Sequence, residues 1–296
     1  MGYIMNQKYV WDTQTWPNFS WNNAALLSPL SEARKAQAEL LSIQSLVTDN
    51  DRKRTTPNYT AKLTEAALYK WHSDLFLNGR EGLKKVALNR FRYDPRRNIA
   101  IEIQNFLMWW NEPPLDLDTL IRAAIAHLWF TSIQPFEDGA DDILFQLTDL
   151  AFAQDEKCEF RLHDFQIQIL NHRESYFEIL EKTQTGTSDI TEWVVWFLKE
   201  FTECCKAQSE MVNRYMQAAL FWQKNSSTDL NERQRKIINH LLTHDQHVVI
   251  TNRLCVELCS SNREAIKRDL SGLVESALLE IHGQGRSVGY ILRKQD

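Results

Sequence analysis

The chain has 296 residues, of which 43% are hydrophobic and 25% are charged. This composition is that of a globular protein of two or three domains, and it excludes the disordered, collagen-like and disulfide-scaffold classes. The formal net charge of −5 excludes a chain that binds nucleic acid nonspecifically over its whole surface. Charge is unevenly distributed, because residues 230–296 hold 10 Lys and Arg against 8 Asp and Glu, a net charge of +2. The sequence therefore predicts an acidic body with a mildly basic C-terminal part.

The scarcity of glycine (9) and proline (7) favours helices joined by short loops over β-rich folds. The five cysteines include no CxxC pair, so we expect them to be reduced thiols of a cytosolic protein. The longest apolar stretch, residues 121–130, contains Arg122 and His127 and is about half as long as a membrane span. We therefore expect a cytoplasmic protein without membrane insertion.

The predicted elements begin with an irregular aromatic arm over residues 1–25, which we expect to pack on the body through its tryptophans. Charged and aromatic sequence over 78–98 predicts a short β hairpin. Hydrophobic periodicity predicts helices, in chain order, over residues 29–47, 60–76, 99–110, 117–132, 143–153, 163–182 and 190–223. Their candidate N-caps include Thr60 or Thr64, Asp116 and Asp189. The helices over 117–132 and 143–153 are strongly apolar, so we expect them to be buried in a bundle.

A polar linker follows Lys224, and the charge changes sign after it. Beyond it the pattern predicts helices over 231–243, 252–259 and 262–276, then two short strands over 278–281 and 288–292. This order is typical of a winged helix-turn-helix. The predicted domains are residues 1–60, an N-terminal arm and helix; 61–224, a helical core; and 225–296, the winged domain.

The third of these C-terminal helices opens with polar and basic residues that suit contacts to DNA. Asn and Arg at the start of a recognition helix reach base edges, while Lys and Arg also bind phosphates. The candidate DNA-binding residues are Ser261, Asn262, Arg263, Lys267, Arg268 and, in the wing, Arg286. A net charge of +2 is small for a DNA-binding domain, so docking of a protein partner stays open as the alternative.

The central segment Gln134-Pro-Phe-Glu-Asp-Gly-Ala-Asp-Asp142 lies between two apolar helices. It resembles the motif HPFxDGNGRxxR of Fic-domain adenylyltransferases. Further matches run almost from end to end; they include the aromatic N-terminus, the segments 71–76, 106–114 and 183–193, and the winged C-terminal part. The chain is thus similar to bacterial Fic proteins with an N-terminal extension and a C-terminal winged helix, which implies a mainly helical Fic-fold bundle.

Fic proteins transfer AMP from ATP to hydroxyl side chains of proteins, and the resemblance implies a role for each motif position. The histidine acts as general base, and the carboxylate before the first glycine holds Mg²⁺ on the phosphates. The backbone amides that follow bind phosphate oxygens at the start of a helix. The two arginines neutralise the β- and γ-phosphates.

Carried onto this chain, the motif keeps its loop residues and loses most of its chemistry. The matching positions are Pro135, Phe136, Asp138 and Gly139. The positions that differ are Gln134 for the histidine, Ala140 for the asparagine, Asp141 for the second glycine, and Asp142 and Phe145 for the two arginines. We therefore expect no catalytic residue in this vestigial motif, and Asp138 is its candidate metal ligand.

Four carboxylates, at positions 137, 138, 141 and 142, fall within six residues of each other in this motif. A like-charge contact at about 4 Å costs about 4 kcal/mol at an effective dielectric of about 20, so we expect a triphosphate to be repelled. The same cluster is also consistent with solvated carboxylates at a helix N-terminus, with a divalent-cation site, or with a surface for an arginine-rich partner. His127, on the apolar helix before the motif, is expected to be a hydrogen-bonded core histidine.

Two regulatory features that the resemblance implies are not matched. The inhibitory motif [S/T]xxxE[G/N] does not occur between Ser42 and Thr64. Its glutamate would act on the arginine that Asp142 replaces. A target-docking hairpin would fall near residues 86–93, where no such pattern is recognisable.

The leading hypothesis is a pseudo-adenylyltransferase of the Fic family that has lost protein AMPylation and acts as a regulatory or binding protein. One alternative is an enzyme with residual or altered metal-dependent nucleotidyl or phosphate-group transfer to protein hydroxyls. Another is a DNA-binding transcriptional regulator that acts through the winged helix. No cofactor is expected, and ATP and Mg²⁺ are implied only if activity is retained. We expect a protein partner, keep DNA as a second candidate partner, and take a homodimer as an expectation from the resemblance.

Overall fold

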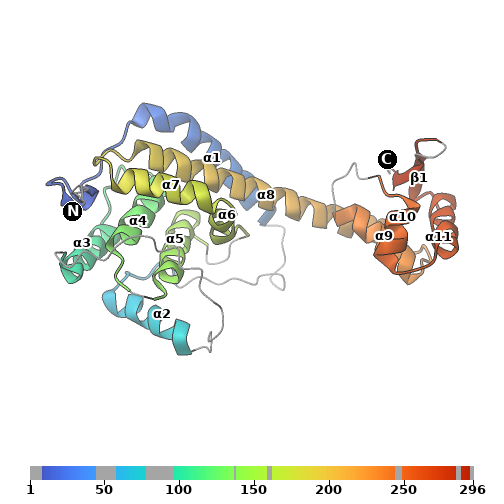
Figure 1. The fold of residues 1–296 in the computed structure, drawn as a ribbon, viewed down its shortest axis with the longest axis horizontal. Helices are drawn as coiled ribbons and strands as arrows, with labels where there is room; N and C mark the ends of the chain where they lie inside the picture. Colours follow the sequence, from blue (N-terminus) through green and yellow to red (C-terminus); the bar gives the residue numbers. More distant parts are fainter. Residues whose placement is uncertain are drawn as a thin grey trace, which may run out of the picture. The chain divides into compact units, whose positions relative to one another are not determined.

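A computed structural model describes residues 9–44, 58–77, 97–136, 138–158, 162–243, 249–284 and 288–293. The chain divides into two compact units, Met1–Gln208 and Ser209–Asp296 (Figure 1). The division falls inside the long helix α8 (Thr191–Lys224). The domain boundaries expected at residues 60 and 224 remain predictions.

The first unit is built of α helices, which confirms the predicted mainly helical fold. Its elements are the short 3-10 helix η1 (Val10–Asp12), α1 (Asn23–Gln44), α2 (Glu65–Leu77), α3 (Ile99–Asn111), α4 (Thr119–Ile133), α5 (Ala140–Glu156), α6 (Phe165–Asn171), α7 (Arg173–Gln184) and the first part of α8. Among the described helices of the whole chain, none combines the length and the apolar character needed to cross a membrane.

Side-chain caps place several helix starts differently from the prediction. Asp118, not Asp116, caps α4, because its carboxylate accepts two N–H groups of the first turn, at 2.8 and 3.4 Å. Thr64 is the cap of α2, and its hydroxyl accepts an N–H at 3.2 Å. Asp189 accepts the first N–H of α8 at 2.9 Å, as expected of a residue at this helix start. Which of several neighbouring residues caps a helix thus depends on the three-dimensional structure and cannot be read from the sequence pattern alone.

Two helices differ in extent from the prediction. Helix α1 begins at Asn23 rather than at residue 29, because the side chain of Asn22 accepts the N–H of Ala24 at 3.0 Å. Pro29, which has no N–H to donate, lies inside this helix. The helix predicted over 163–182 is two helices, α6 and α7, which meet at His172.

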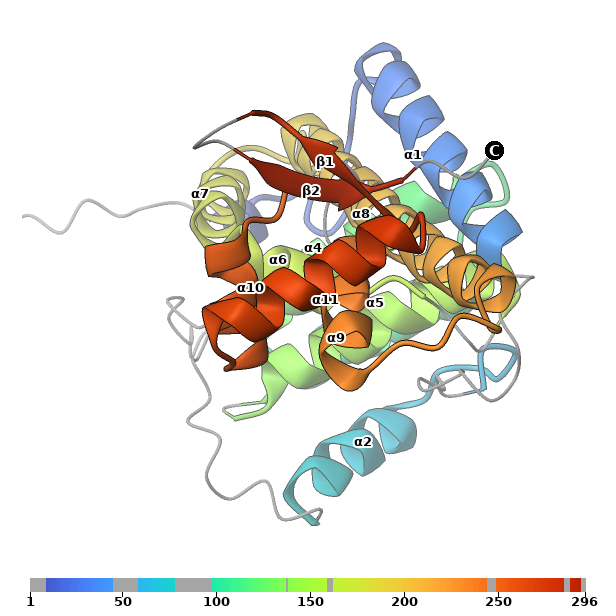
Figure 2. The ribbon, with the colours of Figure 1, turned by 90° about the vertical axis from the view of Figure 1, so that its right-hand side faces the viewer.

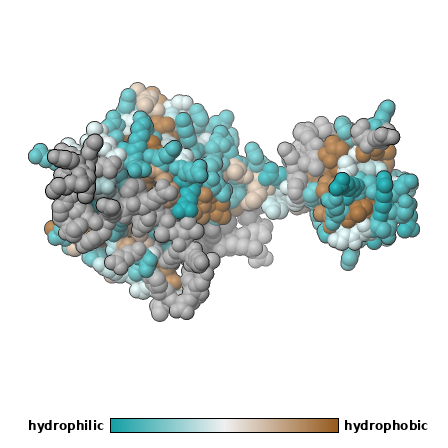
Figure 3. All heavy atoms as spheres, in the orientation of Figure 1, coloured by the Kyte–Doolittle hydropathy of each residue, from teal (hydrophilic) through white to brown (hydrophobic). Residues whose placement is uncertain are grey.

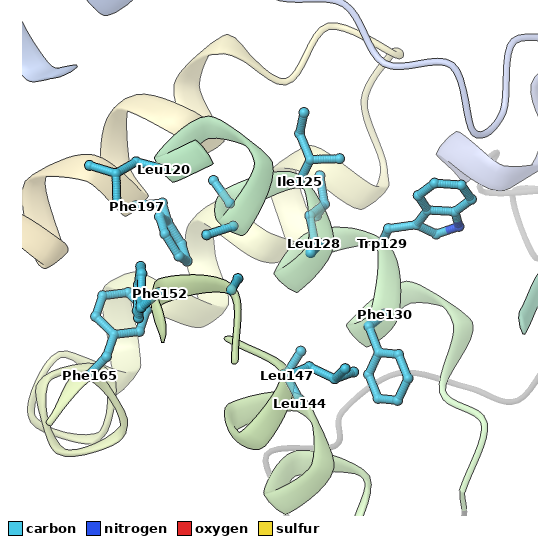
Figure 4. Close-up of a cluster of buried hydrophobic side chains, with 14 of the residues drawn as sticks. Leu120, Ile125, Leu128, Trp129, Phe130, Leu144, Leu147, Phe152, Phe165 and Phe197 are labelled. Carbon is cyan, nitrogen blue, oxygen red and sulfur yellow. The ribbon is translucent and has the colours of Figure 1, made fainter. Parts of the chain in front are cut away.

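Helix α4 lies in the core of the first unit, and thirteen of its fifteen residues are buried. It packs along α5, and Figure 4 shows Phe130 of α4 beside Leu144 and Leu147 of α5. Phe152, Phe165 and Phe197 form an adjoining aromatic group, with ring centroids 4.8–6.1 Å apart. This confirms the prediction that the two apolar helices are buried in a bundle. On the face seen in Figure 3, hydrophilic residues surround smaller hydrophobic patches.

The aromatic arm packs on this core through its rings, as predicted for the part of it that the structure describes. Trp16 and Phe19 both meet Trp129 of α4 edge-on, with centroids 6.3 and 6.2 Å apart. Arg97 lies over the rings of Trp11 and Trp16, at 4.8 and 5.7 Å. The arm is also held by an isolated β-bridge between residues 20 and 189.

The second unit contains the end of α8, three short helices and a β hairpin (Figure 2). Its elements are α9 (Glu232–Thr243), α10 (Asn252–Cys259), α11 (Arg263–Glu275), β1 (Leu279–His282) and β2 (Gly289–Leu292). The strands pair antiparallel, and Ile250 forms an isolated bridge with Tyr290 of β2. A Cβ at Gly289 would lie 2.2 Å from the side chain of Val249, so only glycine fits at this crossing. The element order is the predicted one, and its identification as a winged helix remains a prediction.

A polar network ties α1 to α4 and α5. Arg34 of α1 donates to both carboxylate oxygens of Asp118 at 2.9 Å and to Asp155 at 2.6 Å. Asp155 also accepts from Gln37 at 2.6 Å and from Thr119. Burial opposes the ionisation of Asp155, but these hydrogen bonds outweigh it and lower its pKa. The network therefore favours the charged carboxylate at neutral pH.

We expect Arg34→Ala to lower the free energy of unfolding by about 2 kcal/mol, because it leaves two partly buried carboxylates without their charged donor. Lys70→Ala is the matched control, since it removes an exposed pair with Asp74 and should cost less than about 0.5 kcal/mol. Urea unfolding of the three proteins measures both values. Equal losses in the two variants would contradict the role given to Arg34.

Candidate functional site

The motif loop, residues 134–139, joins the end of α4 to the start of α5, and a left-handed residue stands at each end. Gln134 is the C-cap of α4 with φ 50°, and its N–H donates to the Phe130 carbonyl at 3.2 Å. Gly139 is the N-cap of α5 with φ 73°, a conformation that favours glycine. Helix α5 therefore begins at Ala140 rather than at the predicted residue 143.

Helix α2 holds the motif loop through His72. The imidazole stacks on the ring of Phe136, with centroids 4.2 Å apart and planes inclined by 13°. Its Nε2 lies 2.8 Å from the carbonyl oxygen of Asp138, so that nitrogen donates a hydrogen bond to the carbonyl. Tyr69 meets Phe136 edge-on at 5.8 Å. The sequence pattern gave His72 no role, although its segment is among those that carry the resemblance.

The start of α5, where the resemblance implies bound phosphates, is closely packed. Its hollow has a volume of about 10 Å³ and is lined by Phe130, Thr131, Gln134, Ala140, Asp141 and Leu144. That volume accommodates about one water molecule. The polar residues that line this small space are Thr131, Gln134 and Asp141, and no arginine is among the lining residues.

The remaining motif positions lie apart from this hollow. Phe145, at the position of the second arginine, is only 5% exposed, and its ring lies 5.7 Å from that of His127. Asp138, the candidate metal ligand, is exposed, and Asp142 is half-buried. Among the described residues, no three His, Cys, Asp or Glu side chains are grouped closely enough to hold a metal ion. Position 137 lies outside the described residues.

His127 is a hydrogen-bonded core histidine, as predicted. The Thr148 hydroxyl donates to the Leu144 carbonyl at 2.8 Å, so its oxygen accepts from Nδ1 of His127, 2.8 Å away. Nε2 then accepts from the Tyr176 hydroxyl at 3.1 Å. Burial lowers the pKa of His127 to about 3, so the ring is neutral at physiological pH.

Tyr176 links this buried pair to the motif. Burial raises the pKa of the Tyr176 hydroxyl, a hydrogen bond with Thr131 opposes that shift, and the charge of Asp141 adds to it. Thr131 and Asp141 both line the small hollow at the start of α5. Polar contacts thus run from the core to the place where the resemblance implies phosphates.

The candidate DNA-binding residues fall into three groups. Asn262 caps α11, and its side chain accepts the N–H of Ala265 at 2.8 Å, so it has a structural role that the prediction did not include. Arg263, Lys267 and Arg268 are exposed, as is Asn262, and Ser261 is half-buried. Arg286 lies outside the described residues. So do residues 78–96, which contain the predicted hairpin, and residues 45–57, most of the segment searched for an inhibitory motif.

Comparisons with known proteins identify two regions of the chain. The sequence model of the Fic/DOC family matches residues 62–152, and that of a domain of unknown function, DUF4172, matches residues 9–65. No curated protein matches the chain. Among solved structures, a Fic family protein from Desulfovibrio desulfuricans G20 is similar at 12% identity and a TM-score of 0.38, over 93% of this chain and 98% of that one.

The low pKa of His127 predicts a pH-dependent stability. The unfolded chain binds a proton near pH 6.5 and the folded chain only near pH 3, so acidification favours unfolding. This contribution is fully present above pH 6.5 and is lost at about 1.4 kcal/mol per pH unit below it. Between pH 7 and 5 the wild type should therefore lose about 2 kcal/mol more than His127→Gln. Urea unfolding at these pH values measures the difference, and parallel pH profiles would contradict it.

The contacts of His72 predict that removing this side chain destabilises the motif loop. We expect His72→Ala to remove one hydrogen bond of about 1 kcal/mol and to speed amide exchange over residues 138–143 by about fivefold. Tyr69→Ala is the control, because it removes only the edge-on ring contact. Hydrogen–deuterium exchange with mass spectrometry measures both variants. Unchanged exchange in His72→Ala would show that α2 does not hold the loop.

Proposed function

This chain is a Fic-domain protein, and from this premise we propose that it has lost AMP transfer and acts as a regulatory or binding protein. The observation that carries the proposal is the lining of the hollow at the start of α5, which includes Asp141 and Gln134 and no arginine. A triphosphate with its metal ion needs several donor groups at such a helix start. The residues present in the described part of this site do not fit such a ligand.

Electrostatics support the proposal. Asp141 lines the hollow and Asp142 follows it in the first turn of α5, where Fic catalysis requires phosphate contacts and an arginine. A carboxylate about 4 Å from a phosphate opposes binding by about 4 kcal/mol at an effective dielectric of about 20. The positive end of the helix dipole is thereby occupied by the protein's own negative charges.

Gln134 supports it independently, because an amide cannot accept the proton of a target hydroxyl at neutral pH. Loss of a general base lowers a rate by about 10²–10⁴-fold. Gln134 also occupies the left-handed cap position of α4, so its backbone keeps the loop geometry without the base. His127 does not replace it, since that ring is fully buried and bonded on both nitrogens.

The alternative is a residual metal-dependent transfer of a nucleotidyl or phosphate group to protein hydroxyls. Asp138 would be its metal ligand, because it is exposed and matches the family position. Among the described residues, Asp138 belongs to no group of three or more His, Cys, Asp or Glu side chains that could hold a metal ion. The same experiment distinguishes the two functions.

We expect the full-length protein to transfer no label from ATP labelled at the α- or γ-phosphate, with Mg²⁺ or Mn²⁺ and a cell lysate. Its melting temperature should also stay unchanged by ATP–Mg²⁺, since no binding energy is gained. Asp138→Ala is the control variant. Transfer that disappears in Asp138→Ala would overturn the proposal and establish the alternative.

A further inference from the structure

Helix α11 exposes three cations, Arg263, Lys267 and Arg268. Arg263, Lys267 and Arg268 form no ion pair with a carboxylate in the described residues. By contrast, Arg233 of α9 pairs with Asp269 at 2.6 Å, and Arg253 of α10 pairs with Glu257 at 3.2 Å. The exposed face of α11 therefore carries three cations that no described carboxylate engages in an ion pair.

These cations lie on two opposite flanks of the exposed face of α11. The buried residues that define the inner face are Ala265, Ile266, Asp269, Leu270 and Leu273. At 3.6 residues per turn, the middle of the outer face holds Glu264 and Ser271. Arg263 and Lys267 then fall on one flank and Arg268 on the other. Across the exposed face of the helix, cations therefore lie on both flanks, and a carboxylate and a hydroxyl lie between them.

This order matches the major groove of duplex DNA. The groove is about 12 Å wide and admits one α helix, with phosphates along both rims and base edges on its floor. Cations on the flanks of an inserted helix meet the phosphates. A carboxylate between them faces the floor, where the amino group of cytosine is its hydrogen-bond donor. We propose that α11 binds in the major groove of duplex DNA, with Arg263, Lys267 and Arg268 on phosphates and Glu264 on a cytosine.

The carboxylates of the outer face distinguish DNA from an acidic protein partner. Glu264 lies in the middle of the exposed face, and Glu275 lies on the same side in the last turn. An acidic protein surface pressed on α11 would bring like charges together there, which is unfavourable. A DNA groove separates its negative rims from a floor that carries hydrogen-bond donors, so it accommodates these carboxylates.

The surrounding contacts hold α11 in a fixed orientation, as a DNA recognition helix requires. Asp269 accepts from Arg233 and from Asn231 of the chain before α9, at 2.6 and 2.8 Å. Asn262 fixes the first turn as its cap. DNA binding by α11 does not depend on whether the Fic domain transfers AMP.

The test uses the full-length protein and a fluorescein-labelled random-sequence duplex of about 20 base pairs, with anisotropy measured from about 50 to 200 mM salt. Three phosphate contacts predict a slope of log K against log salt of about −2.7. Arg263→Ala with Lys267→Ala should bring it to about −0.9. Lys199→Ala, an exposed cation of the first unit, is the matched control and should leave the slope unchanged. Absence of binding at 50 mM salt, or an unchanged slope in the double variant, would overturn the proposal. If α11 is instead a surface for a protein partner, the protein should not bind the duplex at 50 mM salt.

A second arm tests the base contact. Selection from a pool of randomised duplexes should give a preference of about tenfold for cytosine at one position. Glu264→Ala should remove that preference and leave the salt slope as it is, because the residue touches no phosphate. Circular dichroism confirms that the variants are folded. Identical selected sequences for the wild type and Glu264→Ala would refute the assignment of Glu264.

Discussion

A helix that is buried on every side must satisfy its polar side chains within the core, and α4 places this requirement at the centre of the first unit. Arg122 meets it through its two terminal nitrogens, which donate to Gln154 and to the Trp110 carbonyl at 2.9 and 2.8 Å, while its guanidinium lies over the Trp110 ring. Burial lowers the pKa of Arg122 to about 10. His127 meets the same requirement through Thr148 and Tyr176. The polar groups of α4, as well as its apolar surface, therefore determine which side chains can pack around it.

The last turn of α4 carries this constraint to the motif loop. The Ser132 hydroxyl accepts from Gln184 of α7 at 2.9 Å, and its carbonyl accepts from Arg97 at 2.5 Å. Arg97 in turn pairs with Glu102 and lies under Trp11 and Trp16 of the arm. The start of the motif loop is therefore fixed from the core, from α7 and from the N-terminal arm together. This scaffold surrounds Gln134, Asp141 and Asp142, which stand where the Fic motif has its histidine, its second glycine and its first arginine.

The sequence predicted the features that depend on local pattern. Apolar content identified α4 and α5 as buried helices, and the spacing of the C-terminal elements predicted three helices and a hairpin. The misses involve choices that depend on tertiary contacts. Asp116 and Asp118 are equivalent as caps by sequence, and the structure places Asp118, the observed cap of α4, against Arg34 of a distant helix.

The site shows the same division. The differences from the family motif at its histidine and its two arginines could be read directly from the sequence, as Gln134, Asp142 and Phe145. The small volume of the hollow at the start of α5, about 10 Å³, could not be read from the sequence, because it results from the packing of separate helices. His72 was missed for a similar reason, since its partner Asp138 is 66 residues away in the chain. The sequence predicted Asn262 as a DNA contact, which stays a prediction, and the structure adds that its side chain caps α11.

The burial of Phe145 bears on how this protein could evolve further. An arginine introduced at that position would replace a core ring beside a neutral histidine, where a charge without a partner costs several kcal/mol. A loss of that size is comparable to the whole stability of many domains. The surrounding core would thus have to change before an arginine at position 145 could be tolerated. The packing of the interior, and not only the residues at the surface of the site, therefore disfavours the family's second arginine in this chain.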